Sequence, residues 1–125
     1  MKKFLFLIVI FNFLVLSQTA KAQTTPLLFN EVTLVPIFIG GQAKLNEFVS
    51  QNFITPDIEG ITGLIKISFI IEIDGSLTNI KITQNLGSEF ESAAKNVFLK
   101  SPKWIPGELN GEKVRVLMNY PINIR

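Results

Sequence analysis

The chain has 125 residues, the length of a single domain. It contains no cysteine and no histidine, and its 12 basic and 10 acidic residues give a net charge of +2. These counts exclude disulfides and thiol or histidine nucleophiles, together with zinc or haem sites built on those residues. The stability of the fold must therefore come from packing.

The N-terminal residues resemble a secretory signal. A basic Met1–Lys3 precedes the 13-residue run Phe4–Leu16, which is almost wholly apolar, and Ala20 and Ala22 form a small-x-small ending. We expect residues 1–22 to be a signal peptide that is cleaved after Ala22. The alternative is an inner-membrane anchor through uncleaved residues 4–20. A 13-residue helix spans only roughly 20 Å, however, against about 30 Å of hydrocarbon.

Cleavage would change the charge of the chain. Lys2, Lys3 and Lys21 would leave, so that nine basic residues would face ten acidic ones, for a net charge of −1. Binding to nucleic acid would then lack an electrostatic driving force. We therefore expect an exported, periplasmic protein that does not bind nucleic acid.

The mature chain begins with a short lead-in, residues 23–30, and residues 31–125 form one domain. Glu31–Ile39 alternates loosely around a proline, which predicts an extended edge segment. Two glycines follow, and apolar residues at helical spacing then predict a helix over Gln42–Gln51. Phe53–Gly60 is expected to be a loop because it contains both proline and glycine.

The strongest strand signal covers Ile61–Ile73. Every second residue is apolar, which predicts one buried face made of Ile65, Ile67, Phe69, Ile71 and Ile73. Asp74-Gly75 tolerates the backbone angles of a tight hairpin turn. Leu77–Thr83 is therefore expected to return as the partner strand.

A second helix is predicted after Gly87. Ser88-Glu89-Phe90-Glu91 has the Ser-x-x-Glu form of a capping box, with both carboxylates near the positive end of the helix. The apolar stripe consists of Phe90, Ala94, Val97 and Phe98. Because Pro102 disfavours a helical residue before it, we expect the helix to end near Ser101.

The last quarter of the chain predicts a strand with one covered face. Asn110-Gly111 is a turn signal, and every second residue from Val114 to Ile124 is apolar. Trp104, held between two prolines, is expected to pack against the covered face. The element order predicts an α+β fold, an antiparallel sheet of about three strands with two helices packed on one face.

The same C-terminal strand is the candidate docking edge. No later element follows to pair its outer side, so its main-chain groups could accept an extended peptide. Leu117 is apolar on the wet face; it either touches the ligand or is an isolated exposed leucine. The charged residues of this strand are also explained as solubilising groups. The candidate partner-binding residues are Lys113, Arg115, Val116, Leu117, Met118, Asn119 and Tyr120.

The sequence predicts no catalytic site, no cofactor and no metal. Glu72 and Asp74 share a strand face, but a solvated hairpin end is favoured over a carboxylate pair. Trp104 is either a ligand platform or a core anchor, and the anchor is favoured. No glycine-rich phosphate loop is present. We therefore predict that the protein is not an enzyme and has no small-molecule substrate.

Six motifs follow one another at spacings that resemble a known family. They are Pro36-x-Phe38-x-Gly40-Gly41, Gly63, Phe69, Asp74-Gly75, Pro102-x-Trp104-x-Pro106-Gly107-x-x-Asn110-Gly111 and Pro121-Ile122. The series is similar to the C-terminal domain of TonB proteins, in the version of Bacteroidetes-type bacteria, over about Glu31–Arg125. Ile39 and Thr55 stand where that pattern usually has a proline and an aromatic residue.

The resemblance implies a periplasmic α+β domain that binds a short segment of its partner by adding it to the sheet. The implied partner is an outer-membrane TonB-dependent transporter or another envelope protein, and the implied process is TonB-linked transport. The family's membrane anchor and long proline-rich linker have no counterpart in the sequence, so we expect a free module. The alternative is a structural or assembly protein of the envelope, a homodimer paired through the same edge.

Overall fold

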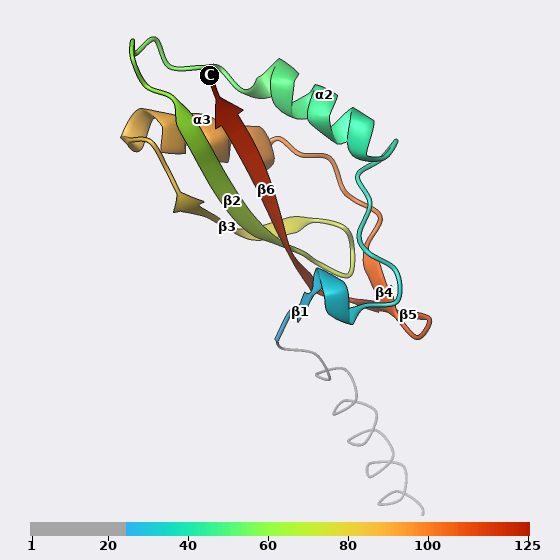
Figure 1. Ribbon diagram of the computed structural model, residues 1–125. Helices are drawn as coiled ribbons and strands as arrows, with labels where there is room; N and C mark the ends of the chain where they lie inside the picture. The colour runs from blue at the N-terminus through green and yellow to red at the C-terminus, as the bar shows by residue number, and fades with distance from the viewer. Residues whose placement is uncertain (1–24) are drawn as a thin grey trace, which may run out of the picture.

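A four-stranded sheet forms the centre of the computed structural model, which describes residues 25–125 (Figure 1). The signal peptide predicted for residues 1–22 lies outside the described residues. The strands, in spatial order, are β1 (Leu27–Leu28), β6 (Val116–Ile124), β2 (Gly63–Ile71) and β3 (Leu77–Gln84). β2 is antiparallel to both neighbours, whereas β1 runs parallel to β6. The predicted three-stranded antiparallel sheet is confirmed, and β1 makes it mixed.

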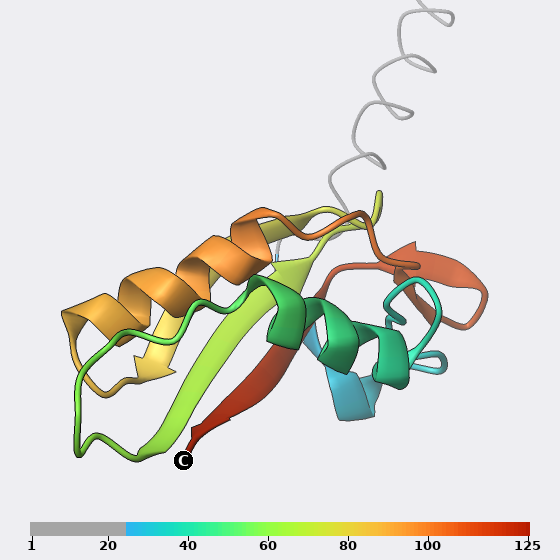
Figure 2. The same cartoon turned by 90° about the horizontal axis from the view of Figure 1, so that it is seen from above.

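Two helices pack on one face of this sheet, as predicted for an α+β fold (Figure 2). They are α2 (Gln42–Asn52) and α3 (Ser88–Leu99). A 3-10 turn, η1 (Phe29–Glu31), follows β1, and a small second sheet pairs β4 (Gly107–Leu109) with β5 (Glu112–Val114). No helix within residues 25–125 is long and apolar enough to cross a membrane.

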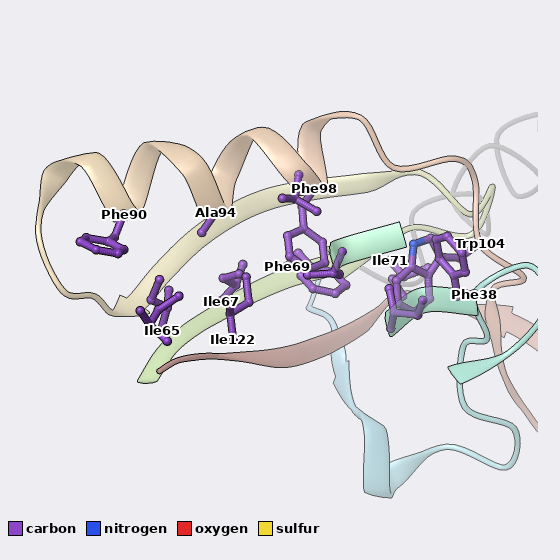
Figure 3. Packing of buried hydrophobic residues seen from close by; sticks show 14 residues of the cluster. Phe38, Ile65, Ile67, Phe69, Ile71, Phe90, Ala94, Phe98, Trp104 and Ile122 are labelled. Carbon is purple, nitrogen blue, oxygen red and sulfur yellow. The ribbon is translucent and has the colours of Figure 1, made fainter. Parts of the chain in front are cut away.

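The core lies between the helices and the inner face of the sheet (Figure 3). The predicted inward face of β2 is confirmed from Ile65 to Ile71, where its residues are almost fully buried, but Ser68 and Ile70 on the opposite face are buried as well, so burial does not alternate beyond Lys66. Ile73 was predicted on the same face but is 54% exposed, because β2 ends at Ile71 and the hairpin turn begins. The stripe of α3 is buried as predicted, namely Phe90, Ala94, Val97 and Phe98.

The capping box predicted at the start of α3 is wrong. Gly87 is the N-cap residue, and Ser88 is already the first helical residue, so its hydroxyl makes no cap hydrogen bond. The turn is held instead by Asn85, whose Oδ1 accepts from the Gly87 N–H at 3.0 Å. Glu91 still lies in the first helical turn, where a carboxylate is favourable.

The stretch after Gly111, predicted as one strand, folds as two strands, β5 and β6. Asn110 and Gly111 both have positive φ, at 52° and 87°, and form the predicted turn between β4 and β5. The chain then changes sheets at Arg115, and β6 begins at Val116. The predicted extended segment Glu31–Ile39 begins in η1 and contacts this hairpin through two isolated bridges, Leu34–Glu108 and Ile37–Ile105.

Trp104 joins the hairpins to the core. Its main-chain N–H donates to the Gly75 carbonyl at 2.8 Å, and its indole N–H donates to the Ser101 hydroxyl at 2.9 Å. The ring packs edge-on against Phe38 at 5.4 Å and lies 5.6 Å from Phe69. Only 5% of Trp104 is exposed. The prediction that Trp104 is a core anchor is therefore confirmed.

We expect Trp104→Ala to lower the free energy of unfolding by about 3–5 kcal/mol, because it empties the space between two aromatic rings. Urea melts measure this loss. Ile105→Ala is the matched control, since the neighbouring side chain is 51% exposed and should cost well under half as much. Similar losses for the two variants would contradict the assignment of Trp104 as the anchor.

Gly75→Ala tests the contact beneath Trp104. A Cβ at position 75 would lie 2.0 Å from the Trp104 carbonyl oxygen, in addition to the strain of φ at +87°. Gly111→Ala is the control because Gly111 has the same φ and open space around it. We expect the control to lose about 1–2 kcal/mol in urea melts and Gly75→Ala to lose distinctly more. Equal losses would show that the close contact costs nothing.

Candidate functional site

Strand β6 has a free outer edge along most of its length. On one side it pairs with β2 over all nine residues from Val116 to Ile124. On the other side, β1 covers only Val116 and Leu117. Within residues 25–125, the stretch Met118–Ile124 therefore has no strand partner on its outer side.

The β1 contact shows which main-chain groups face outward. The Leu27 N–H donates to the Arg115 carbonyl at 3.0 Å, so that carbonyl points toward the outer edge. Main-chain direction alternates along a strand, and the β6–β2 register is unbroken. The N–H and carbonyl groups of Asn119 and Asn123 therefore face outward too. Pro121 lies between them and presents only a carbonyl, because proline has no N–H.

A groove runs between this edge and helix α2. It consists of two adjoining pockets of about 430 and 380 Å³, which share Asn46, Tyr120 and Pro121. We call the two pockets together the β6–α2 groove. The first pocket lies beside Met118–Pro121 and the second beside Tyr120–Arg125. An extended segment laid along β6 would thus lie beneath α2.

The first pocket reaches down to the core. Phe69 and Trp104, which belong to the buried cluster, line it together with Phe38 of the extended segment before α2. The second pocket is lined by Val49 and Phe53, on the side of the C-terminal end of α2. Both pockets can therefore accept apolar side chains.

One hydrogen bond crosses the groove where the pockets meet. The Tyr120 hydroxyl donates to Asn46 Oδ1 at 2.7 Å, and Gln42 Nε2 donates to the same oxygen at 3.2 Å. Burial raises the pKa of Tyr120 above its ordinary value of 10.0. The phenol is protonated at neutral pH, and its hydrogen bond links β6 to α2.

The β6–α2 groove is almost uncharged. Among the described residues that line it, Arg125 alone has a side chain that is charged at neutral pH. Away from Arg125, a charged ligand segment would lose hydration there without gaining an ion pair. The groove therefore suits an uncharged, extended segment.

The opposite edge of the sheet is built differently. β3 carries an extra residue at two places in its pairing with β2, between the partners of Lys66 and Ile67 and between those of Ser68 and Ile70. Asn79 in the second bulge has a positive φ of 53°. Bulges interrupt the row of main-chain groups and discourage pairing with another strand. The straight edge is therefore that of β6.

The predicted site residues fall into two groups. Met118, Asn119 and Tyr120 line the first pocket of the groove. Lys113 lies in β5, opposite Glu108, and Val116 is fully buried. The premise that no element pairs the outer side of this strand is wrong at its start, because β1 occupies Val116 and Leu117.

Arg115 serves a structural role that the sequence did not indicate. Its Nε donates to Glu72 Oε1 at 2.7 Å and a terminal nitrogen donates to Glu72 Oε2 at 3.2 Å. This bidentate pair ties the β2–β3 hairpin to the start of β6. Its two members are 43 positions apart, so no local pattern could reveal it.

Sequence reasoning also missed half of the groove. Residues 121–125 of β6 and its C-terminal end line the second pocket, and α2 forms the opposite wall. One signal was present: a proline inside a strand pattern indicates an edge strand, with its nitrogen turned away from the neighbouring strand. Pro121 follows this rule. No pattern in the sequence predicts that α2 lies beside β6.

The acidic residues of the hairpin are engaged in structural contacts. The hydrogen bond from Arg115 lowers the pKa of Glu72, and hydrogen bonds from Ser76 lower the pKa of Asp74. Asp74 Oδ1 accepts from both the N–H and the hydroxyl of Ser76. Within residues 25–125, no group of histidine, cysteine, aspartate or glutamate could hold a metal ion.

We expect the Arg115–Glu72 pair to contribute to stability in a pH-dependent way. Because the folded-state pKa of Glu72 lies below its ordinary value of 4.5, the contribution is complete above that pH and is lost as the pH falls through the folded-state pKa. Arg115→Met should cost about 1–3 kcal/mol in urea melts at pH 7 and clearly less at pH 3.

Lys113→Met is the control for this experiment, since it removes an exposed cation two residues away that forms no ion pair within residues 25–125. It should change the free energy of unfolding little at either pH. A cost for Arg115→Met that does not depend on pH would contradict the ionic nature of the pair.

The sequence of the chain matches one known protein family over more than half of its length. The family described as Gram-negative bacterial TonB protein C-terminal matches residues 57–124, which include β2, β3, α3 and β6. The NMR solution structure of the Helicobacter pylori TonB C-terminal domain is 27% identical, with a TM-score of 0.44, and the match covers 66% of this chain and 90% of that one. A search of curated proteins finds no match.

Proposed function

Because the chain belongs to the family of TonB C-terminal domains, as its sequence motifs indicated, we propose that it binds an envelope protein by strand addition at the free edge of β6. An extended segment of the partner would lie in the β6–α2 groove and continue the sheet beyond Met118–Ile124. The protein would act as an interaction module in TonB-linked transport and would catalyse no reaction.

The proposal rests on two observations. The outer edge of β6 is unpaired along Met118–Ile124 and has no bulge in its register with β2. The β6–α2 groove runs along this edge. The outward N–H and carbonyl groups of Asn119 and Asn123 can be satisfied by water or by another backbone. Strand addition uses such groups for affinity and pockets on alternate side chains for specificity. β1 already pairs with the same edge at Val116 and Leu117, which supports the edge as one that accepts a strand.

The chemistry of the groove favours one kind of partner segment. Side chains of an added strand that face α2 would enter the two pockets, of which the first is mainly apolar and the second has both polar and apolar walls, while those on the opposite side would face solvent. The segment should therefore be uncharged, with apolar residues at alternate positions. We propose a periplasm-facing segment of an outer-membrane transporter as the source, and export of the mature chain from Gln23 onward as the route to it.

An NMR titration tests the site. Synthetic peptides that cover the periplasm-facing segments of outer-membrane transporters are added to the isotope-labelled protein. We expect the largest amide shifts in residues 117–125 of β6 and in α2, because both line the groove. Shifts confined to β3 or to the β4–β5 hairpin would contradict strand addition at β6.

A bulky residue in the groove should block the same peptides. Ser50 of α2 lines the second pocket, so Ser50→Trp should weaken binding at least about tenfold by filling it. Ala43→Trp is the control, because Ala43 is exposed on α2 and lines neither pocket. Equal effects of the two substitutions would show that the groove is not the site.

Sedimentation of the protein without peptide tests the alternative, in which a second copy pairs with the β6 edge. A dimer that Ser50→Trp dissociates and Ala43→Trp leaves intact would replace the transporter segment by a second copy as the occupant. A monomer that binds the peptides would support the proposal.

A further inference from the structure

Pro121 stands at the centre of the free edge, and its place in the sheet has a consequence for binding. On the premise of the proposed function, we propose that Pro121 limits the strength of strand addition to β6. It withholds one main-chain hydrogen bond from any added strand. The edge is thereby kept open for reversible binding.

Within the protein itself, the proline costs no hydrogen bond. Pro121 is opposite Lys66, and the β6–β2 register runs unbroken past this pair from Gly63 to Ile71. The alternation set by the Arg115 carbonyl turns the Pro121 nitrogen toward the outer edge. A proline is tolerated inside a strand only in this orientation. The missing N–H donor therefore weakens pairing with an added strand and leaves the pairing of β6 with β2 unchanged.

An added strand would lack the hydrogen bond from position 121 in any alignment. The outward donors of the open stretch belong to Asn119 and Asn123, four positions apart, and the position midway between them offers a carbonyl alone. Whichever peptide residue lies beside Pro121, its carbonyl meets no N–H there. A carbonyl that lies between two paired strands without a donor weakens the complex.

β1 pairs with one part of the outer edge of β6 and leaves the rest open, and this arrangement agrees with a limiting role for Pro121. At the start of β6, where Leu117 still has an outward N–H, the protein pairs the edge with its own strand β1. The part left open is the part that contains the proline. Natural sheets use proline in exposed edge strands to discourage permanent pairing with other chains.

Replacing the proline should therefore strengthen binding. Pro121→Val restores an outward N–H in a residue type that favours strands. We expect its Kd to fall about fivefold, the effect of one additional net hydrogen bond. The probes are the transporter peptide that shifts the β6 amides most and a short, neutral peptide of alternating threonine and valine. Pro121→Ala is the second variant, in case the valine perturbs the fold.

A direct readout separates the hydrogen bond from a steric effect, because the Pro121 ring also lines both pockets. In the variants, the N–H at position 121 should exchange rapidly with solvent in the free protein and slowly in the complex. Asn123→Pro is the matched opposite, since it removes an outward donor, and it should weaken binding by a similar factor.

The outcomes are distinguishable from failure of the proposed function. If the wild type binds and the folded Pro121 variants bind equally or more weakly, this inference is wrong and strand addition stands. Tighter binding with no protection of the N–H at position 121 would assign the effect to the shape of the ring, and would also overturn the inference. If the wild type and all variants bind neither peptide, both proposals fail.

Discussion

The close approach of Trp104 to Gly75 is the contact on which the rest of the structure depends. It joins the β2–β3 turn to the segment that follows α3, two regions that no strand pairing connects. Only glycine leaves room for the Trp104 carbonyl at this turn. Once the main chains are joined, the indole fills the space between Phe38 and Phe69. The core and the floor of the β6–α2 groove are consequently one packed unit.

Local patterns in the sequence predicted the parts of the fold that depend on near neighbours. The alternation in β2 and β6, the turns at Gly75 and Gly111 and the apolar stripe of α3 are all encoded within short windows. The start of α3 was misjudged by one residue, because Ser-x-x-Glu fits a capping box whether or not its serine is outside the helix. β1 has only two residues, too few to show any period.

The candidate site was predicted in outline but not in its limits. An edge strand could be recognised from its alternation, and three of the residues predicted to bind a partner, Met118–Tyr120, line the first pocket of the groove. What covers the two ends of that strand depends on distant contacts. β1 pairs with the start of β6, and Glu72 forms an ion pair with Arg115 just before it. α2 lines the pocket beside the C-terminal end of β6. None of these three contacts can be predicted from the spacing of residues along β6.

A groove built on the core has an energetic consequence for its ligand. Trp104 and Phe69 are held by packing and by main-chain contacts, and the bond between Tyr120 and Asn46 sets the distance to α2. The binding surface is therefore ordered before a partner arrives. The entropy cost of binding then falls mainly on the incoming segment, which must become extended. Segments that β-branched residues already keep extended in solution would lose the least conformational entropy on binding. Affinity among related partner segments should thus follow their tendency to be extended as much as the fit of their side chains.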